Sequence, residues 1–270
     1  MSLFFHTFVI LSLLTFPVVL LSSGEAATSI EVGWQRLAAL QPDAAAEMFE
    51  RFPEEREAQL GRALSLLAQQ PVTRGNVLRA EALLESLVRD GGSFAAEAYF
   101  YLARVAQVHY FTPEPAKAVE RYDALIEAHP ESPFAELAEV KSAILRLYVL
   151  DHPDGAERLI EELDQRGRGL RMPHTIRDFY WNLADGVAYF ELESFLAYEF
   201  LQRVDATGRA EGTLRANLLA RLGESARKMG YADAAIKYFS RYLDEFSRSK
   251  RAYMIQEIRE QLVKKQRGAE

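Results

Sequence analysis

Apolar residues recur at three- and four-residue spacings along almost the whole chain from Thr28 onward. Leu60, Ala63, Leu64 and Leu67 give one example, and no segment shows a sustained alternation of apolar and polar residues. Spacings of three and four place apolar side chains on one face of an α-helix, whereas a strand needs a period of two. The pattern therefore predicts an all-α protein.

Turn-forming residues interrupt this pattern at short intervals, so the predicted helices are short. The interruptions are Gln41-Pro42-Asp43, Gln70-Pro71, Gly91-Gly92-Ser93, Thr112-Pro113-Glu114, His129-Pro130, Asp151-His152-Pro153-Asp154, residues 167–173, Thr207-Gly208, Gly230 and Phe246-Ser247. Short helices separated by frequent tight turns favour a series of helical hairpins.

The hairpins carry a repeated arrangement of small and aromatic residues, which is clearest in residues 218–249. Gly223 and Ala235 lie twelve positions apart, and Phe239 follows one helical turn later. This arrangement resembles the tetratricopeptide repeat (TPR), in which small residues lie where two antiparallel helices cross and an aromatic ring fills the space beside them. Ser247 stands where that pattern usually has proline.

Further copies of the pattern extend the resemblance over most of residues 34–247. Residues 99–132 fit if the turn between the two helices is three residues longer, with Leu102-Ala103, Ala118 and Tyr122 at the matching positions. Looser copies are Leu60-Gly61 with Ala80 and Leu84, Leu137-Ala138 with Ala156 and Ile160, Leu183-Ala184 with Ala197 and Leu201, and a degenerate unit from Trp34 with Leu37-Ala38, Ala45 and Phe49.

The resemblance implies a superhelical solenoid of antiparallel helix pairs, with about twelve helices. One hairpin buries too little apolar surface to fold alone, so stacked neighbours supply the core. We expect this repeat domain to cover residues 27–247. Residues 248–270 carry seven Lys or Arg against three Glu and are expected to form a capping helix with a basic tail.

An apolar run at residues 4–21 indicates an export signal. Gly24-Glu25-Ala26 places small residues where signal peptidase needs them, so residues 1–26 are predicted to be a signal peptide cleaved before Ala27. No Lys or Arg precedes the run, and an uncleaved N-terminal membrane anchor is the alternative. The chain has no Cys, which excludes a lipid-modified cysteine.

The charge and the missing motifs narrow the classes of function. A net charge of −7 argues against binding to nucleic acid, which needs a basic surface. The sequence has no nucleophile elbow, phosphate-binding glycine loop or zinc-binding HExxH helix, and its five His never pair at helical spacing. No cofactor and no metal are therefore expected.

In TPR proteins the first helix of each pair lines a concave groove that binds a peptide. Positions carried over from the small residue of each first helix predict the partner-binding residues Phe100, Arg104, Trp181, Asp185, Tyr189, Arg227 and Lys228. Trp181 lies off the apolar stripe of its own helix, which favours a binding role because Trp, Tyr and Arg dominate interface energies. The alternative is that Trp181 packs against the neighbouring repeat.

Residues 132–145 (SPFAELAEVKSAIL) are similar to units of the outer-membrane assembly and Tol-Pal-associated TPR proteins of Gram-negative bacteria. That resemblance implies an exported, non-enzymatic scaffold of the cell envelope that binds a protein segment. Trp181 and Phe100 would be its apolar anchors, and Arg104, Arg227 and Lys228 would pair with acidic groups. Two alternatives stay open: a peptidoglycan-acting enzyme of the envelope, which needs a groove carboxyl with a raised pKa, and a membrane-anchored TPR protein.

Overall fold

The computed structural model describes residues 29–267, which form thirteen α-helices and one π-helix and contain no strand. The helices are α1 (Ile30–Ala38), α2 (Pro42–Phe49), α3 (Arg56–Ala68), α4 (Arg74–Asp90), α5 (Ala95–Arg104), the π-helix η1 (Val105–His109), α6 (Pro115–Ala128), α7 (Pro133–Tyr148), α8 (Ala156–Gly167), α9 (Pro173–Tyr189), α10 (Ser194–Ala206), α11 (Gly212–Lys228), α12 (Ala232–Phe246) and α13 (Ala252–Arg267). The all-α solenoid predicted from the sequence is confirmed.

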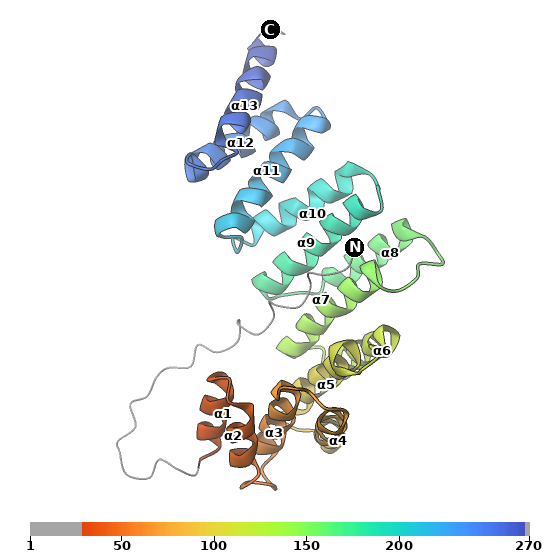
Figure 1. Cartoon of the computed structure of the whole chain (residues 1–270). Helices are drawn as coiled ribbons and strands as arrows, with labels where there is room; N and C mark the ends of the chain where they lie inside the picture. Colours follow the sequence, from red (N-terminus) through yellow and green to blue (C-terminus); the bar gives the residue numbers. More distant parts are fainter. Residues whose placement is uncertain (1–28, 268–270) are drawn as a thin grey trace.

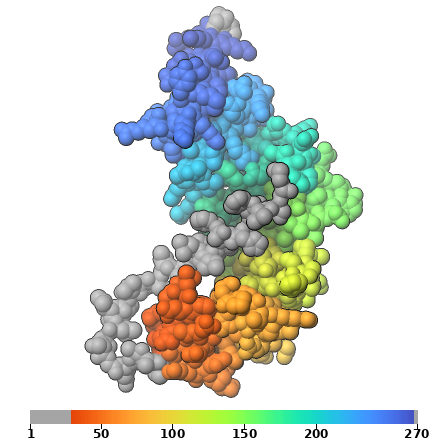
Figure 2. All heavy atoms as spheres, in the orientation of Figure 1, coloured from red at the N-terminus to blue at the C-terminus, as the bar shows by residue number. Residues whose placement is uncertain are grey.

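The helices pair in chain order and stack into an elongated, bent body (Figures 1 and 2). The first helices of successive pairs contact one another directly, α5 with α7 and α7 with α9, whereas no comparable contact joins the described helices α6 and α8 or α8 and α10. From α5 to α10, first helices therefore lie on the inner side of the bend and second helices on the outer side, where α6 and α8 lie in Figure 1. Side-chain contacts of Arg221 with α9 place α11 next in the inner row. We call the side lined by α5, α7, α9 and α11 the inner surface.

Local signals in the sequence set the helix boundaries. Pro42, Pro115, Pro133 and Pro173 each occupy the first turn of a helix, where the missing N–H costs no hydrogen bond. Gly230 follows α11 with φ of 80°, a conformation that favours glycine, and turns the chain into α12. Pro42, Pro173 and Gly230 are among the interruptions seen in the sequence, and Pro115 and Pro133 follow shortly after two others.

Small residues let the two helices of a pair approach closely, with an aromatic ring between them. Within the pair α11–α12, a Cβ atom on Gly223 would lie 2.4 Å from the Phe239 ring. Between consecutive pairs, a Cβ atom on Gly61 of α3 would lie 2.3 Å from the Phe49 ring of α2. Gly33 makes the same contact with Phe49 from α1. In the first pair, Gly33 therefore makes the close contact with the ring. The repeat pattern in the sequence assigns that position to Leu37-Ala38.

The repeat at residues 99–132 accommodates its extra residues by a change of helix type. The chain runs from α5 into η1, and Tyr110 then donates a hydrogen bond to Glu81 of α4. Arg121 of α6 pairs with the same carboxylate, with 2.7 Å between Nη2 and Oε1. The predicted longer turn is therefore partly helical and is held to the preceding pair.

One buried carboxylate joins two consecutive pairs. Glu136 of α7 accepts hydrogen bonds from the backbone N–H groups of Arg171 and Met172, at 3.1 and 2.9 Å, and from the Thr175 hydroxyl at 2.6 Å. Burial raises the pKa of Glu136, but these bonds outweigh burial and the net shift is downward. The ionised carboxylate thus caps the start of α9 from the preceding pair.

Candidate functional site

Three consecutive first helices bring aromatic and charged side chains together on the inner surface. We call this group the aromatic–arginine cluster: Tyr148 of α7, Trp181, Asp185 and Tyr189 of α9, and Arg221 of α11. The three residues of α9 are spaced by four, which places them in one row along the helix. Their row lies beside the stripe that α9 buries in the core.

Arg221 joins two members of that row across the boundary between repeats. Its guanidinium carbon lies 5.1 Å from the centre of the Trp181 ring, and its Nη1 donates to Asp185 Oδ1 at 2.6 Å. A planar guanidinium can stack on an aromatic face while it donates to a carboxylate. Both charged side chains keep about a third of their surface or more, so the ion pair contributes only about 0–1 kcal/mol to folding.

The two tyrosines complete the cluster with apolar surface that solvent reaches. Their rings lie edge to face at 5.6 Å between centres, and Tyr189 is 65% exposed. The Tyr148 hydroxyl donates to the backbone carbonyl of Asn182 at 3.1 Å. Burial, with a smaller contribution from the Asp185 charge, raises the pKa of Tyr148 to about 12, so this phenol is a neutral donor at physiological pH.

The structure brings together Trp181, Asp185 and Tyr189 from the predicted set. Trp181 is partly buried against the main core cluster, so it also has the contact with the neighbouring repeat that the alternative interpretation required. The side of its ring that Arg221 stacks on still lies at the inner surface.

Arg227 and Lys228 lie at the exposed end of α11, apart from this contact. Arg227 pairs with Glu224 on its own helix, at 2.8 Å between Nη2 and Oε2. The arginine that reaches Trp181 is Arg221, two positions before Gly223, which the carried-over positions missed. The residues that contact Trp181 depend on how α9 and α11 cross, and one repeat does not encode that crossing.

For Phe100 the prediction of an exposed anchor is wrong. Its ring is 8% exposed and packs against Tyr122 and Phe134, with 5.8 Å between ring centres in both pairs. Phe100 therefore belongs to the core between α5, α6 and α7. Arg104, one turn further along α5, is partly exposed and donates to the Gln107 side chain at 2.8 Å.

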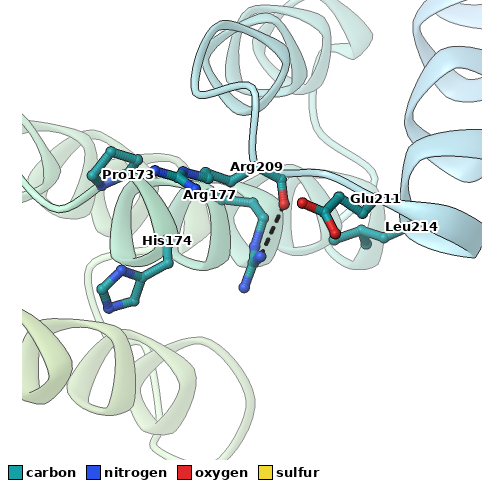
Figure 3. A pocket seen from close by; sticks show the side chains of 6 residues that line it. All are labelled: Pro173, His174, Arg177, Arg209, Glu211 and Leu214. Atoms are coloured by element: carbon teal, nitrogen blue, oxygen red, sulfur yellow. Dashed lines mark hydrogen bonds between the residues drawn. The ribbon is translucent and has the colours of Figure 1, made fainter. Parts of the chain in front are cut away.

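A pocket of about 490 Å³ lies where the start of α9 meets the loop before α11 (Figure 3). It is lined by Pro173, His174, Arg177, Arg209, Glu211 and Leu214. Arg177 donates to the backbone carbonyl of Arg209 at 3.0 Å, which ties the helix to the loop. The pocket is open and of mixed charge, and it contains none of the predicted site residues.

Within residues 29–267 no three His, Asp or Glu side chains come together as a metal site. None of the helices in that part of the chain is long and apolar enough to cross a membrane. The predicted signal segment, residues 1–26, lies outside the described residues.

Comparison with solved structures defines the class of fold. No family model matches the chain, and no curated protein matches it. PilW, a widely conserved type IV pilus biogenesis factor, superposes with a TM-score of 0.53 at 16% identity, over 84% of this chain and 96% of PilW. A TPR protein from Parabacteroides merdae gives a TM-score of 0.43 at 15% identity, over 87% and 82% of the two chains. The chain thus shares its fold with PilW and has the TPR-like solenoid architecture that the sequence predicts.

Proposed function

We propose that the chain is a non-catalytic scaffold of the bacterial cell envelope that binds an extended segment of a partner protein along its inner surface. The aromatic–arginine cluster is the main contact in this proposal. Trp181 and Tyr189 supply apolar area, and Arg221 and Asp185 supply directional polar groups. Arg227 and Lys228, further along α11, serve as accessible cations at the rim.

The observation that carries the proposal is the composition of the cluster and its position. Trp, Tyr and Arg are the residue types that contribute most to binding energy at protein interfaces. Here they come from three consecutive repeats, and Tyr189 leaves most of its ring exposed. Folding gains little from an exposed aromatic ring or from a surface ion pair. A partner segment would bury both.

The enzyme alternative requires a carboxyl group with a raised pKa beside the bound substrate. Burial raises the pKa of Glu97, and it raises that of Glu139 in spite of Arg166 beside it. Glu139 is held in an ion pair between α7 and α8, with 3.0 Å to Arg166 Nε. Neither carboxyl lines the pocket in Figure 3, so this pocket does not supply the general acid that a glycosidase needs.

Two features support the proposed location in the envelope: the apolar run in residues 1–26, and the fold shared with a pilus biogenesis factor. The mass of the chain after export separates the two forms of this proposal. A chain that starts at Ala27 means a free periplasmic protein. A chain that keeps its first residues means a membrane-anchored one.

Photo-crosslinking in cells tests the binding role. A photoreactive amino acid at position 189 should capture a discrete partner, because this side chain is 65% exposed and lies in the same row of α9 as Trp181. Trp181→Ala should then abolish capture, and with the identified partner it should weaken affinity by about 2 kcal/mol or more.

The matched control places the same photoreactive residue at position 253, on the C-terminal helix, where Tyr253 is 73% exposed. This position should not capture the same partner. Capture that is equal at both positions, or that survives Trp181→Ala, would contradict binding at the cluster.

A further inference from the structure

Large apolar side chains are exposed mainly in or beside the turns within each helix pair, where a first helix leads into its second helix. Phe111, Val149 and Tyr231 lie in three such turns. The turns that lead from one pair to the next, such as residues 168–172 and 207–211, carry none of the large exposed apolar side chains. One edge of the solenoid is therefore more apolar than the other.

A row of aromatic rings joins two consecutive turns of this edge. The Tyr148 ring lies 5.6 Å from the Tyr189 ring, between centres. Phe190 lies 5.0 Å from Tyr189 and 5.2 Å from the imidazole of His152. We call these four residues, together with Val149, which follows Tyr148, the turn surface. Figure 1 shows the two turns, α7–α8 and α9–α10, on the same side of the body.

The turn surface is open to a partner. Val149 is 53% exposed, and Tyr148 and Tyr189 are exposed as well. Exposed apolar groups contribute little to folding, whereas their burial by another molecule is favourable. Tyr148 and Tyr189 also belong to the aromatic–arginine cluster, so the turn surface continues the inner surface past the ends of α7 and α9.

Exposed carboxylates share these two turns, and their sequence contains no cation other than a histidine. Residues 178–202 hold five Asp or Glu and residues 147–157 hold three, and neither range has Lys or Arg. The exposed carboxylates within the turns are Asp151, Asp154, Glu191 and Glu193. None of these four forms an ion pair with a residue in the described part of the chain, 29–267. The turn surface is thus acidic as well as apolar.

This combination selects the chemistry of the occupant. Unpaired carboxylates repel an acidic peptide or an anionic lipid surface and attract a basic segment. The aromatic rings add to that preference, because a Lys ammonium or an Arg guanidinium is attracted to the face of an aromatic ring. The apolar groups, in turn, need an apolar side chain to cover them.

We propose that the turn surface binds a stretch of the partner segment in which Lys or Arg residues flank a large apolar residue. This inference rests on the proposed function and names the partner chemistry at this edge. The apolar side chain packs on Val149 and Tyr189, and the flanking cations pair with the carboxylates of the two turns. Trp181 and Tyr189 are eight positions apart, about 12 Å along α9, which an extended peptide covers in about four residues. One segment can therefore contact Trp181 on the inner surface and reach the turn surface.

Peptide binding to the purified protein, measured by fluorescence anisotropy, tests this inference. Three labelled dodecapeptides have a central Phe with two residues on either side that are all Lys, all Gln or all Glu, in a Gly-Ser background. A fourth keeps the Lys residues and has Ala in place of Phe. We expect the Lys peptide with Phe to bind about tenfold or more tightly than the Gln peptide and the Ala peptide. The Glu peptide should bind most weakly, and the preference for Lys should fall as salt is raised.

Variants assign the preference to the turn surface. Glu191→Gln combined with Glu193→Gln should reduce the preference for Lys over Gln by at least about fivefold. The matched control, Glu54→Gln with Glu55→Gln, removes the same charge from the exposed turn between α2 and α3 and should leave the preference unchanged. Val149→Ser removes exposed apolar surface, so it should bring the affinities of the Phe and Ala peptides closer together.

Three results would overturn the inference: equal binding of the Lys and Gln peptides, binding of none of the peptides, or a preference that survives Glu191→Gln with Glu193→Gln or that the control reduces as much. Binding to phosphatidylglycerol vesicles in place of the Lys peptide would assign the edge to a membrane and overturn it as well. The proposed function is tested apart from these peptides. If Trp181→Ala abolishes capture from position 189 while Glu191→Gln with Glu193→Gln has no effect on it or on the peptides, the scaffold role stands and the basic-segment site falls.

Discussion

At the scale of single residues, His109 makes the stability of the chain depend on pH. Burial, and then the charge of Arg104, hold the pKa of this imidazole below its usual value in the folded state. Between that lowered pKa and about 6.5 the unfolded chain binds more protons than the folded one, so acid favours unfolding. The contribution of His109 to stability is present above pH 6.5 and is lost as the pH falls through this window.

His109→Gln should therefore lose less stability than the parent chain between pH 7 and pH 5, as measured by urea unfolding at each pH. Arg104→Gln should weaken the same dependence in part, because it removes the second cause of the lowered pKa. Comparison with the parent is essential, since Glu97 and Glu139 have raised pKa values and act with the opposite sign. Identical pH dependence in parent and His109→Gln would contradict the prediction.

Single residues also mark where sequence reasoning stops. Trp181, Asp185 and Tyr189 could be placed together because one helix carries all three at a spacing of four. Arg221 and Tyr148 could not, because their relation to these residues depends on the crossing of helices from different repeats. Phe100 failed for the same reason, since α6 and α7 cover its ring.

At the scale of helix pairs, close contact between glycine and an aromatic ring sets the spacing. Gly223→Ala should destabilise the chain by about 1–3 kcal/mol, because the added methyl would meet Phe239 at 2.4 Å. Thermal or urea unfolding measures this loss. Phe239→Leu in the same chain should make the alanine less costly, so the two changes should not add.

The control is Gly75→Ala in the first turn of α4, where the nearest atom to the new Cβ is the Thr73 hydroxyl oxygen at 3.8 Å. Alanine is the better helix former, so this change should be neutral or stabilise by up to about 1 kcal/mol. Equal effects at positions 223 and 75 would contradict close packing as the cause.

Pairs that match this pattern without gaps could be located from the sequence, as α11 and α12 were. The pattern gave the wrong small residue in α1, where Gly33 makes the contact, and it gave no sign of a π-helix after α5. In a π-helix each backbone hydrogen bond spans five residues instead of four, and the order of apolar residues does not record that difference.

At the scale of the whole molecule, α13 covers the end of the solenoid. Ile255 is 2% exposed in the main core cluster, and Ile258 and Leu262 pack beside it. Ending the chain at Ser249 should cost at least about 2 kcal/mol, from the apolar area of Ile255 alone, and should promote self-association through the uncovered face. Urea unfolding and light scattering measure the two effects.

A chain that ends at Leu262 separates packing from charge. It lacks Lys264, Lys265 and Arg267 but keeps the three packed residues, so it should stay monomeric and nearly as stable as the full chain. If both truncations destabilise equally, the basic end and not the apolar face is what the solenoid needs.

On the inner side of the bend, side-chain contacts join the first helices of consecutive pairs. Between α7 and α9 one such link is the Tyr148 hydroxyl on the Asn182 carbonyl, and between α9 and α11 it is the stacked Arg221. A partner segment that contacts α7, α9 and α11 together would bridge these links. We therefore expect the curvature of the solenoid to vary less in the bound protein than in the free one.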